Sequence, residues 1–273
     1  DSAGLFTAII VGLFITDFYV WMVHKNWTIK MPDTVPPAVS NSFAALFPGF
    51  IVLLLVWVIR MGVEATPMQS IPNIISFFLA DPLGHLSNTL PGALVAEFLI
   101  SFLWIFGIHG ANVVSGVMMP IWLTALNQNH AAFTAGKALP NIVTTSFFDN
   151  FVHMGGSGAT IGLAFLLAFA AKSKELKTLG KLVAGPAIFN INEPILFGLP
   201  IVMNYKMLVP FILTPLINVT TTYIGMATNL VARPMGVYIP WTTPPVLSGF
   251  ISTGHISGAV MQIINIILDT LMY

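Results

Sequence analysis

The stretch 185-GPAIFNINEPILFGLPIVMN-204 combines the features that decide how this chain folds. It is mainly apolar, yet it places Asn190, Asn192 and Glu193 between apolar runs and is interrupted by two glycines and three prolines. Carboxylates are costly in lipid, and irregular backbone at membrane depth is tolerated only where protein buries it or where it lines a wet cavity. The stretch therefore predicts a broken segment beside a polar cavity if the chain lies in a membrane.

The composition of the whole chain supports that setting. Of its 273 residues 56% are hydrophobic and only 7% are charged, whereas soluble domains carry roughly 25% charged residues. The formal net charge is zero, which argues against a nucleic-acid partner. The chain has no cysteine, which excludes disulfides and a thiol nucleophile on it, and its histidines lack ligand spacing. We therefore predict an integral membrane protein without a metal or another cofactor.

Apolar segments and polar connections alternate along the chain. Segments predicted to span a bilayer as helices cover residues 4–23, 43–63, 90–106, 159–171, 207–230 and 251–272. Residues 71–89 are too polar to span, but their apolar positions repeat with a helical period, which predicts an amphipathic helix lying in the membrane interface. Asn88 or Thr89 is expected to cap the next helix, with Pro91 in its first turn.

The segment 172-KSKELKTLGK-181 indicates how the chain is oriented. It carries four lysines and one glutamate, and short lysine-rich loops lie on the cytoplasmic side of membranes. We predict a cytoplasmic loop here. The chain begins at Asp1 without a secretory signal pattern, so we expect a piece of a longer membrane protein.

Two interrupted apolar stretches, near residues 107–120 and 185–200, resemble each other in composition. Paired interrupted segments are typical of transporters, which bind substrate at the breaks. The expected fold is therefore all-α: a multi-span helical transporter with two re-entrant or broken hairpins and an interfacial amphipathic helix. Glu193 is the leading candidate site residue, although a glutamate in a water-exposed loop would explain it as well.

Other candidates carry weaker signals. His109 lies between two glycines in 107-GIHGAN-112, and Asn112 would share its helical face; a histidine satisfied by a nearby carbonyl is an equal alternative. His153 precedes the run 155-GGSG-158, which could form an anion-binding loop or simply allow close packing. Trp241 could stack on a sugar or anchor the chain at the interface. Further acidic residues read as span-end or packing residues: Asp17, Glu97 and Asp269.

Several motifs together resemble one family. The run 185–204 closely resembles the signature of the membrane permease, enzyme IIC, of the bacterial phosphoenolpyruvate-dependent sugar phosphotransferase system, in its lactose, cellobiose and diacetylchitobiose branch. Further matches occur in family order: 104-WIFGIHGANVVSGVMMPIW-122, 154-MGGSGATIGL-163, 210-PFILTP-215 and 239-IPWTTPP-245. Family members are longer, so the chain resembles their C-terminal two thirds.

The resemblance implies group translocation in the bacterial inner membrane. The permease binds a disaccharide, and a separate enzyme IIB, charged by enzyme IIA, phosphorylates the sugar 6-hydroxyl from a phosphocysteine. By this resemblance Glu193 orients the hydroxyl and His109 binds the same ring, while Asn190, Asn192 and Trp241 complete the site. Weaker cavity-lining candidates are Gly110, Asn112, Gly156 and Ser157.

The resemblance also implies a division of the chain and an assembly. Residues 1–89 would end the N-terminal spans, which the family uses in a homodimer interface, and would add the amphipathic connecting helix. Residues 90–273 would form the transport domain that binds the substrate. Membrane lipid would surround both parts.

Other functions remain open on the sequence. An ion-coupled secondary transporter would use the intramembrane acidic residues as an ion relay and would deliver unmodified sugar. A degenerate fragment would keep the motifs without the activity. An intramembrane hydrolase is disfavoured because no Ser/His/Asp or metal arrangement is apparent.

Overall fold

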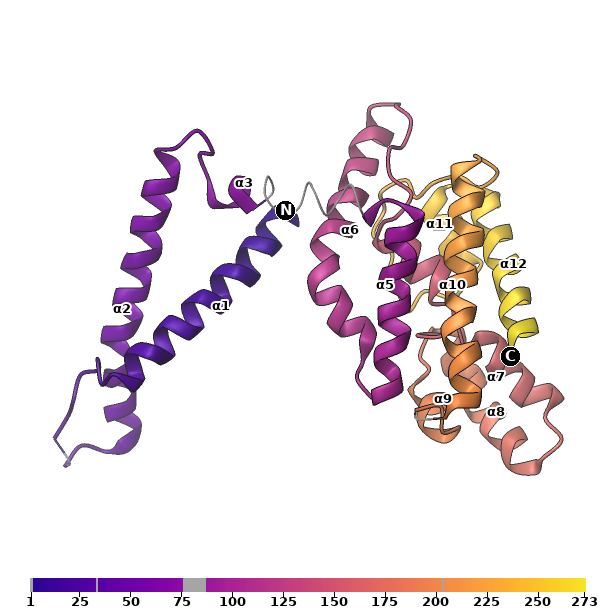
Figure 1. The fold of residues 1–273 in the computed structure, drawn as a ribbon, viewed down its shortest axis with the longest axis horizontal. Helices are drawn as coiled ribbons and strands as arrows, with labels where there is room; N and C mark the ends of the chain where they lie inside the picture. The colour runs from indigo at the N-terminus through magenta and orange to yellow at the C-terminus, as the bar shows by residue number, and fades with distance from the viewer. Residues whose placement is uncertain (1, 33, 76–86, 203) are drawn as a thin grey trace. The chain divides into compact units, whose positions relative to one another are not determined.

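The computed structural model describes residues 2–32, 34–75, 87–202 and 204–273, and every regular element within them is helical (Figure 1). Of these helices, three are long and apolar enough to cross a membrane: α1 (Ser2–His24), α2 (Pro37–Glu64) and α10 (Tyr205–Ala227). The prediction of an all-helical membrane protein is confirmed. The chain divides into two compact units, residues 1–82 and 83–273.

The first unit consists of α1, α2 and the short helix α3 (Ile71–Ile75), and α1 packs against both of the others. Apolar side chains on α2 point outward, with Phe50 61% and Leu53 72% exposed. A helix that presents apolar residues on most of its surface is stable in lipid. The spans predicted over 4–23 and 43–63 are therefore confirmed. An amphipathic helix was predicted over 71–89; α3 covers its first five residues, and residues 76–86 lie outside the described residues, so the rest of this prediction stays a prediction.

The second unit is built around α10, which packs between α5 (Leu90–Leu103) and α12 (Ile256–Met272). Figure 1 shows these helices side by side, with α7, α8 and α9 gathered at one end of the unit. The bounds of the remaining elements are α6 (Gly110–Thr134), α7 (Ile161–Phe165), α8 (Lys174–Ile188), α9 (Glu193–Gly198) and α11 (Leu247–Thr253), with a 3₁₀ turn η2 (Trp104–Phe106) and π-helical turns η3 (Phe147–Val152) and η4 (Leu166–Ala170).

The start of α5 follows the sequence prediction. The Thr89 side chain accepts a hydrogen bond from the Gly92 backbone N–H at 3.2 Å, and Pro91 stands in the first turn. This cap satisfies one of the backbone donors that the first helical turn leaves free.

Three predicted elements differ from the structure, one of them the span predicted over 251–272, which is interrupted at Gly254 and His255 between α11 and α12. Residues 174–181 are not a loop but the first half of α8, because Ser173 caps the helix by accepting from the Leu176 N–H at 3.1 Å and Lys, Glu and Leu favour helices. The predicted span 159–171 is helical only over α7 and η4, Ile161–Ala170. Those residues reach about 15 Å, half of a hydrocarbon core, so this segment does not cross the membrane as a helix.

The π-helical turn η3 lies at the centre of the second unit. Its side chains Phe147, Phe148 and Phe151 are fully buried in the core together with Ile100 of α5 and Trp122 of α6. The helix stops at His153, so no later turn donates hydrogen bonds to its last carbonyls. Those carbonyls still need partners, because an unpaired backbone group away from water is costly.

Side-chain amides from α12 and α10 supply these partners. Gln262 Nε2 donates to the Asn150 carbonyl at 2.5 Å and Asn265 Nδ2 donates to the Phe151 carbonyl at 3.1 Å. From α10, Asn218 Nδ2 donates to the Val152 carbonyl at 3.3 Å. The polar face of α12 thus caps the C-terminal end of η3 inside the protein.

The non-helical segment that leads into η3 is held in the same way. Asn88 Oδ1 accepts from the backbone N–H groups of Ile142 and Val143, each at 3.0 Å. Asn129 donates to the Asn141 carbonyl at 2.8 Å and accepts from the Asn141 N–H at 2.9 Å. Irregular backbone is therefore buried here without losing its hydrogen bonds.

Replacing Gln262 by leucine should test this dependence. The leucine would leave the Asn150 carbonyl and the N–H groups of Val246 and Gly249, which donate to Gln262 Oε1 at 2.6 and 2.7 Å, without partners. At roughly 1–3 kcal/mol for each unpaired group, we expect a clear fall in the melting temperature of the detergent-purified protein. Asn127→Leu, the same kind of change at an exposed position of α6, should leave the melting temperature almost unchanged. Equal melting temperatures for the two variants would contradict this role of Gln262.

Candidate functional site

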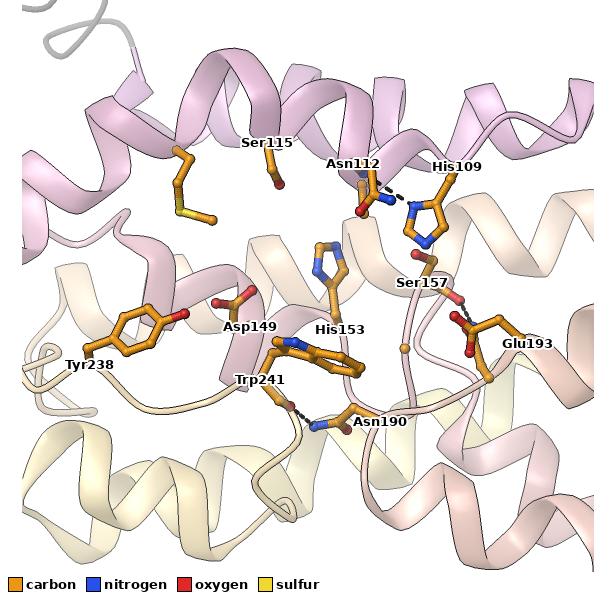
Figure 2. Close-up of a pocket in the computed structure, with 14 residues that line it drawn as sticks. His109, Asn112, Ser115, Asp149, His153, Ser157, Asn190, Glu193, Tyr238 and Trp241 are labelled. Atoms are coloured by element: carbon orange, nitrogen blue, oxygen red, sulfur yellow. Dashed lines mark hydrogen bonds between the residues drawn. The ribbon is translucent and has the colours of Figure 1, made fainter. Parts of the chain in front are cut away.

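A cavity of about 420 Å³ lies in the second unit, between α6, η3 and the loops that precede α9 and α11 (Figure 2). Its walls combine polar and aromatic groups, and its volume lies in the range of roughly 300–1,000 Å³ that is usual for ligand pockets. The lining residues are His109, Ala111, Asn112, Ser115, Met119, Asp149, His153, Gly156, Ser157, Asn190, Asn192, Glu193, Tyr238 and Trp241.

The predicted site residues from both broken stretches line this one cavity, except for Gly110, which is not among its described lining residues. Gly110 instead packs against α5, where a Cβ atom would collide with the Ile100 carbonyl. Its lack of a side chain lets the start of α6 approach α5 closely. A glycine is required at position 110, as the sequence indicated, but for packing between two helices rather than for contact with a ligand.

His109 is positioned by the start of α6. Gly107 turns the chain with a φ of 72°, and His109 Nδ1 accepts from the Asn112 backbone N–H at 3.3 Å. The imidazole also lies against the Trp104 ring, with centroids 4.7 Å apart. Because Nδ1 is an acceptor, the proton of the neutral ring sits on Nε2, which can donate to a ligand oxygen.

The Asn190 side chain connects its own loop before α9 by hydrogen bonds to the loop after η3 and to the loop before α11. Its Oδ1 accepts from the Gly155 N–H at 2.7 Å, and its Nδ2 donates to the carbonyls of Trp241 and Thr243 at 2.5 and 3.3 Å. The residue has a φ of 61°, a left-handed conformation that asparagine tolerates better than most residues. Its amide therefore fixes the position of Trp241 across the cavity.

Asn192 and the glycine run meet beside it. Asn192 Nδ2 donates to the Ser157 carbonyl at 2.6 Å, which joins the residue before α9 to the loop after η3. Gly156 has a φ of 88°, and a Cβ atom there would lie 2.5 Å from Asn192 Cγ. A larger residue would push the two loops apart, so the glycine run serves close packing around the cavity.

Glu193 is the first residue of α9 and is exposed to the cavity rather than buried. Trp241 is 49% exposed, although its backbone carbonyl is held by Asn190. Figure 2 shows Glu193 near Ser157 and His109 at one end of the cavity, with Trp241 along its wall. A carboxylate acceptor, an imidazole donor and an aromatic face are groups that bind a sugar.

The sequence analysis did not propose Asp149 as a cavity residue, although the residue lines the cavity. It singled out His153 only for the glycine run that follows, and it took Glu97, the partner of His153, for a span-end or packing residue. His153 Nε2 lies 2.7 Å from Glu97 Oε2, and Ser101 Oγ donates to the other oxygen of that carboxylate at 2.9 Å. Glu97 is fully buried. The available signal was the spacing of four residues between Asp149 and His153 in an apolar stretch, where ionisable residues usually face a polar pathway.

Replacing Gly156 by alanine should disturb the site through packing alone. The positive φ and the collision with Asn192 together should destabilise the protein by about 2–4 kcal/mol. We expect a lower melting temperature and, by calorimetry, weaker binding of any ligand that the cavity takes. Gly185→Ala is the matched control, since a Cβ atom in that part of α8 meets nothing within 4 Å. A Gly156→Ala protein that matches the control in both measurements would contradict the packing argument.

The comparisons with known proteins agree with the resemblance read from the motifs. The family model described as "Phosphotransferase system, EIIC" matches residues 1–215. The chain is 55% identical over 273 residues to the lichenan permease IIC component of Bacillus subtilis (strain 168), covering 100% of this chain and 60% of that protein. It is 49% identical over 275 residues to the cellobiose-specific EIIC component of Geobacillus stearothermophilus, covering 100% of this chain and 61% of that one.

A solved structure is similar as well. The crystal structure of the IIC component from the N,N'-diacetylchitobiose-specific phosphotransferase system matches with a TM-score of 0.90 at 48% identity, covering 100% of this chain and 63% of that chain. This chain thus spans about three fifths of the length of the curated relatives described above. With a family model over most of its length and relatives at these identities, the chain belongs to the EIIC family of the phosphotransferase system.

Proposed function

We propose that this chain is part of a disaccharide permease of the phosphotransferase system. It would bind a sugar of the cellobiose, diacetylchitobiose or lactose type in the cavity and present the 6-hydroxyl to a phosphorylated enzyme IIB. The observation that carries the proposal is that His109 of the first broken stretch and Glu193 of the second line one and the same cavity. The names of the relatives, which cite lichenan, cellobiose and diacetylchitobiose, support the substrate class.

The chemistry assigned to Glu193 is that of an orienting group and general base. Its carboxylate accepts a hydrogen bond from the sugar 6-hydroxyl and holds the oxygen in line with the phosphocysteine of enzyme IIB. As the S–P bond breaks and the O–P bond forms, the hydroxyl proton passes to the carboxylate. His109 Nε2 donates to the same ring, and Trp241 covers an apolar face of the sugar.

Orientation and partners form the rest of the proposal. The lysines at the start of α8 would lie on the cytoplasmic side of the bacterial cell membrane, where enzyme IIB docks, following the positive-inside rule. The outward apolar side chains of α2 would contact lipid or a second copy of the protein. A homodimer follows from the family resemblance.

Replacing Glu193 by glutamine should separate chemistry from binding. Glutamine keeps the shape but cannot take up the proton, so we expect phosphorylation by phospho-enzyme IIB to slow by about 10²–10⁴-fold while the sugar Kd changes less than about tenfold. Radiolabelled sugar phosphate formation and calorimetry measure the two quantities on the full-length protein. Glu64→Gln, the same change at an exposed glutamate of α2 in the first unit, is the control. Equal losses in both quantities would reduce Glu193 to a sugar ligand, and uptake of free sugar without enzyme IIB would favour an ion-coupled transporter.

Replacing His109 by alanine should weaken the sugar complex. The loss of one hydrogen bond at roughly 1–1.5 kcal/mol predicts about a tenfold rise in Kd. Binding of cellobiose, diacetylchitobiose and lactose to the detergent-purified full-length protein checks this and identifies the substrate. His130→Ala alters a histidine of α6 outside the cavity wall and should have no effect. Should His109→Ala bind as tightly as the unaltered protein, the assignment of this end of the cavity is wrong.

A further inference from the structure

One face of α12 carries a row of buried polar residues that ends in an aspartate. Gln262, Asn265 and Asp269 follow one another at intervals of three and four residues, which places them on the same side of the helix. All three side chains are 0% exposed. Gln262 and Asn265 satisfy backbone carbonyls of η3, whereas Asp269 meets a side chain of α10, the helix that lies beside α12 (Figure 1).

Asp269 is paired with Asn218 of α10 through one atom of each group. Asn218 Nδ2 donates to Asp269 Oδ1 at 2.8 Å. The same nitrogen also donates to the Val152 carbonyl at 3.3 Å, so turning the amide over would set two oxygens against each other there. The two partners of the nitrogen therefore fix the orientation of the Asn218 amide.

The second atom of each group is an oxygen without a donor. Among the groups that the structure describes, neither Asp269 Oδ2 nor Asn218 Oδ1 has a hydrogen-bond partner, and both atoms are buried. A buried acceptor that stays unsatisfied is costly, and a charged one is the most costly. Two such oxygens on two groups that already touch point to a proton shared between them.

The ionisable side chain close to Asp269 is Tyr273, four positions further along the chain, and it brings no positive charge. Its hydroxyl donates to the Gly158 carbonyl at 2.7 Å. Among the elements that pack against α12, the described residues of α7 and α11 include no ionisable side chain, and η3 carries Asp149, which lines the cavity.

From α10, the residue that meets Asp269 is the neutral Asn218. The ionisable residues of that helix stand at least five positions from Asn218; they are Tyr205, Lys206 and Tyr223. An ionised carboxylate buried without a cation is very unfavourable, so a buried acid in this position is most stable when it is neutral.

We propose that Asp269 is a proton-binding site: the folded protein holds it as a neutral carboxylic acid whose O–H group donates to Asn218 Oδ1. A carboxylic acid and a primary amide are complementary, because each offers one donor and one acceptor. With the proton in place, the two groups share two hydrogen bonds and both oxygens are satisfied. The pair fastens α12 to α10 through the same amide that holds the Val152 carbonyl at the end of η3.

This proton is a fixed part of the fold rather than a coupling ion that crosses the membrane. Asp269 is fully buried and does not belong to the described lining residues of the cavity, so neither solvent nor a bound ligand reaches it. An acid that relays protons during transport has to exchange them with water. We therefore expect Asp269 to keep its proton through the transport cycle.

Infrared spectroscopy tests the protonation state directly. Asp269→Asn mimics the proposed neutral acid, since a second amide can make the same two hydrogen bonds with Asn218. At neutral pH the detergent-purified full-length protein should show the C=O band of a protonated carboxylic acid, and this variant should lack it. Asp17→Asn, the same change at an exposed position of α1, should keep the band. If Asp269→Asn loses no acid band, Asp269 is ionised and the proposal is wrong.

The retained proton also predicts how stability depends on pH. An unfolded aspartate has released its proton above about pH 5, while the folded protein keeps it. Unfolding then releases one proton, so stability falls as the pH rises. Relative to Asp269→Asn, the unfolding equilibrium constant of the unaltered protein should rise about tenfold per pH unit, which melting curves over about pH 5–8 would reveal.

Two results of these melting curves would contradict the proposal. Parallel pH dependences for the unaltered protein and Asp269→Asn would show that the folded state holds no extra proton at this position. A variant that matches the unaltered protein in stability at every pH but no longer transports sugar would make Asp269 a relay residue.

A measurement on the unaltered protein stays decisive even if the variant does not fold. Isotopically labelled aspartate shifts the acid bands of aspartates alone. In heavy water the band of Asp269 should shift slowly because its side chain is 0% exposed, whereas an acid group at the cavity wall should exchange at once. We expect an aspartic acid band that persists at neutral pH and exchanges slowly. A spectrum without such a band would overturn the assignment of the proton to Asp269.

Discussion

The fold of the second unit depends on side-chain amides that satisfy broken backbone inside an apolar protein. In lipid, a helix that stops at membrane depth exposes carbonyl and N–H groups that water cannot reach. Here Gln262 and Asn265 of α12 take up carbonyls of η3, Asn129 pairs with the Asn141 backbone, and Asn190 joins Gly155 to Trp241. Each of these amides offers both a donor and an acceptor on a short, neutral side chain, which a charged residue cannot do at the same cost.

The same constraint creates the site. Because the backbone is broken at residues 107–109, at η3 and at residues 189–192, loops from distant parts of the chain can meet around one cavity. Amides hold these loops together: both ends of the Asn190 amide are bonded to backbone groups, and Asn192 Nδ2 donates to the Ser157 carbonyl. Two carboxylates that line the same cavity, Glu193 and Asp149, are exposed and half-buried respectively and can serve a ligand. Polar residues of similar appearance in the sequence therefore divide into those that build the cavity and those that face into it.

Much of this arrangement was predictable. The apolar lengths of α1, α2 and α10 and the cap at Thr89 follow from local chemistry, and the motif at 185–204 predicted a broken segment with a glutamate beside a polar cavity. The predictions were wrong at positions where the local sequence fits two different structures. Lysines at 172–181 look like a loop by charge, but the residues favour a helix once Ser173 caps it. Gly110 looks like a ligand-approach glycine, but its contact is with another helix.

By itself, the sequence determined that this chain is a helical membrane protein of the EIIC family, since composition and the order of motifs depend on no three-dimensional contact. Only the tertiary structure decided which polar residues share a surface. Glu97 and His153 stand 56 positions apart, and no periodicity links them, yet the buried Glu97 carboxyl group and His153 Nε2 share a hydrogen bond of 2.7 Å. Asp149 lines the cavity from the π-helical turn η3, whose aromatic residues Phe148 and Phe151 are buried in the core. The physical reason is that a polar side chain can be buried only where it meets a hydrogen-bond partner. That partner is often on an element far away in the sequence, and only the packing of the elements brings the two together.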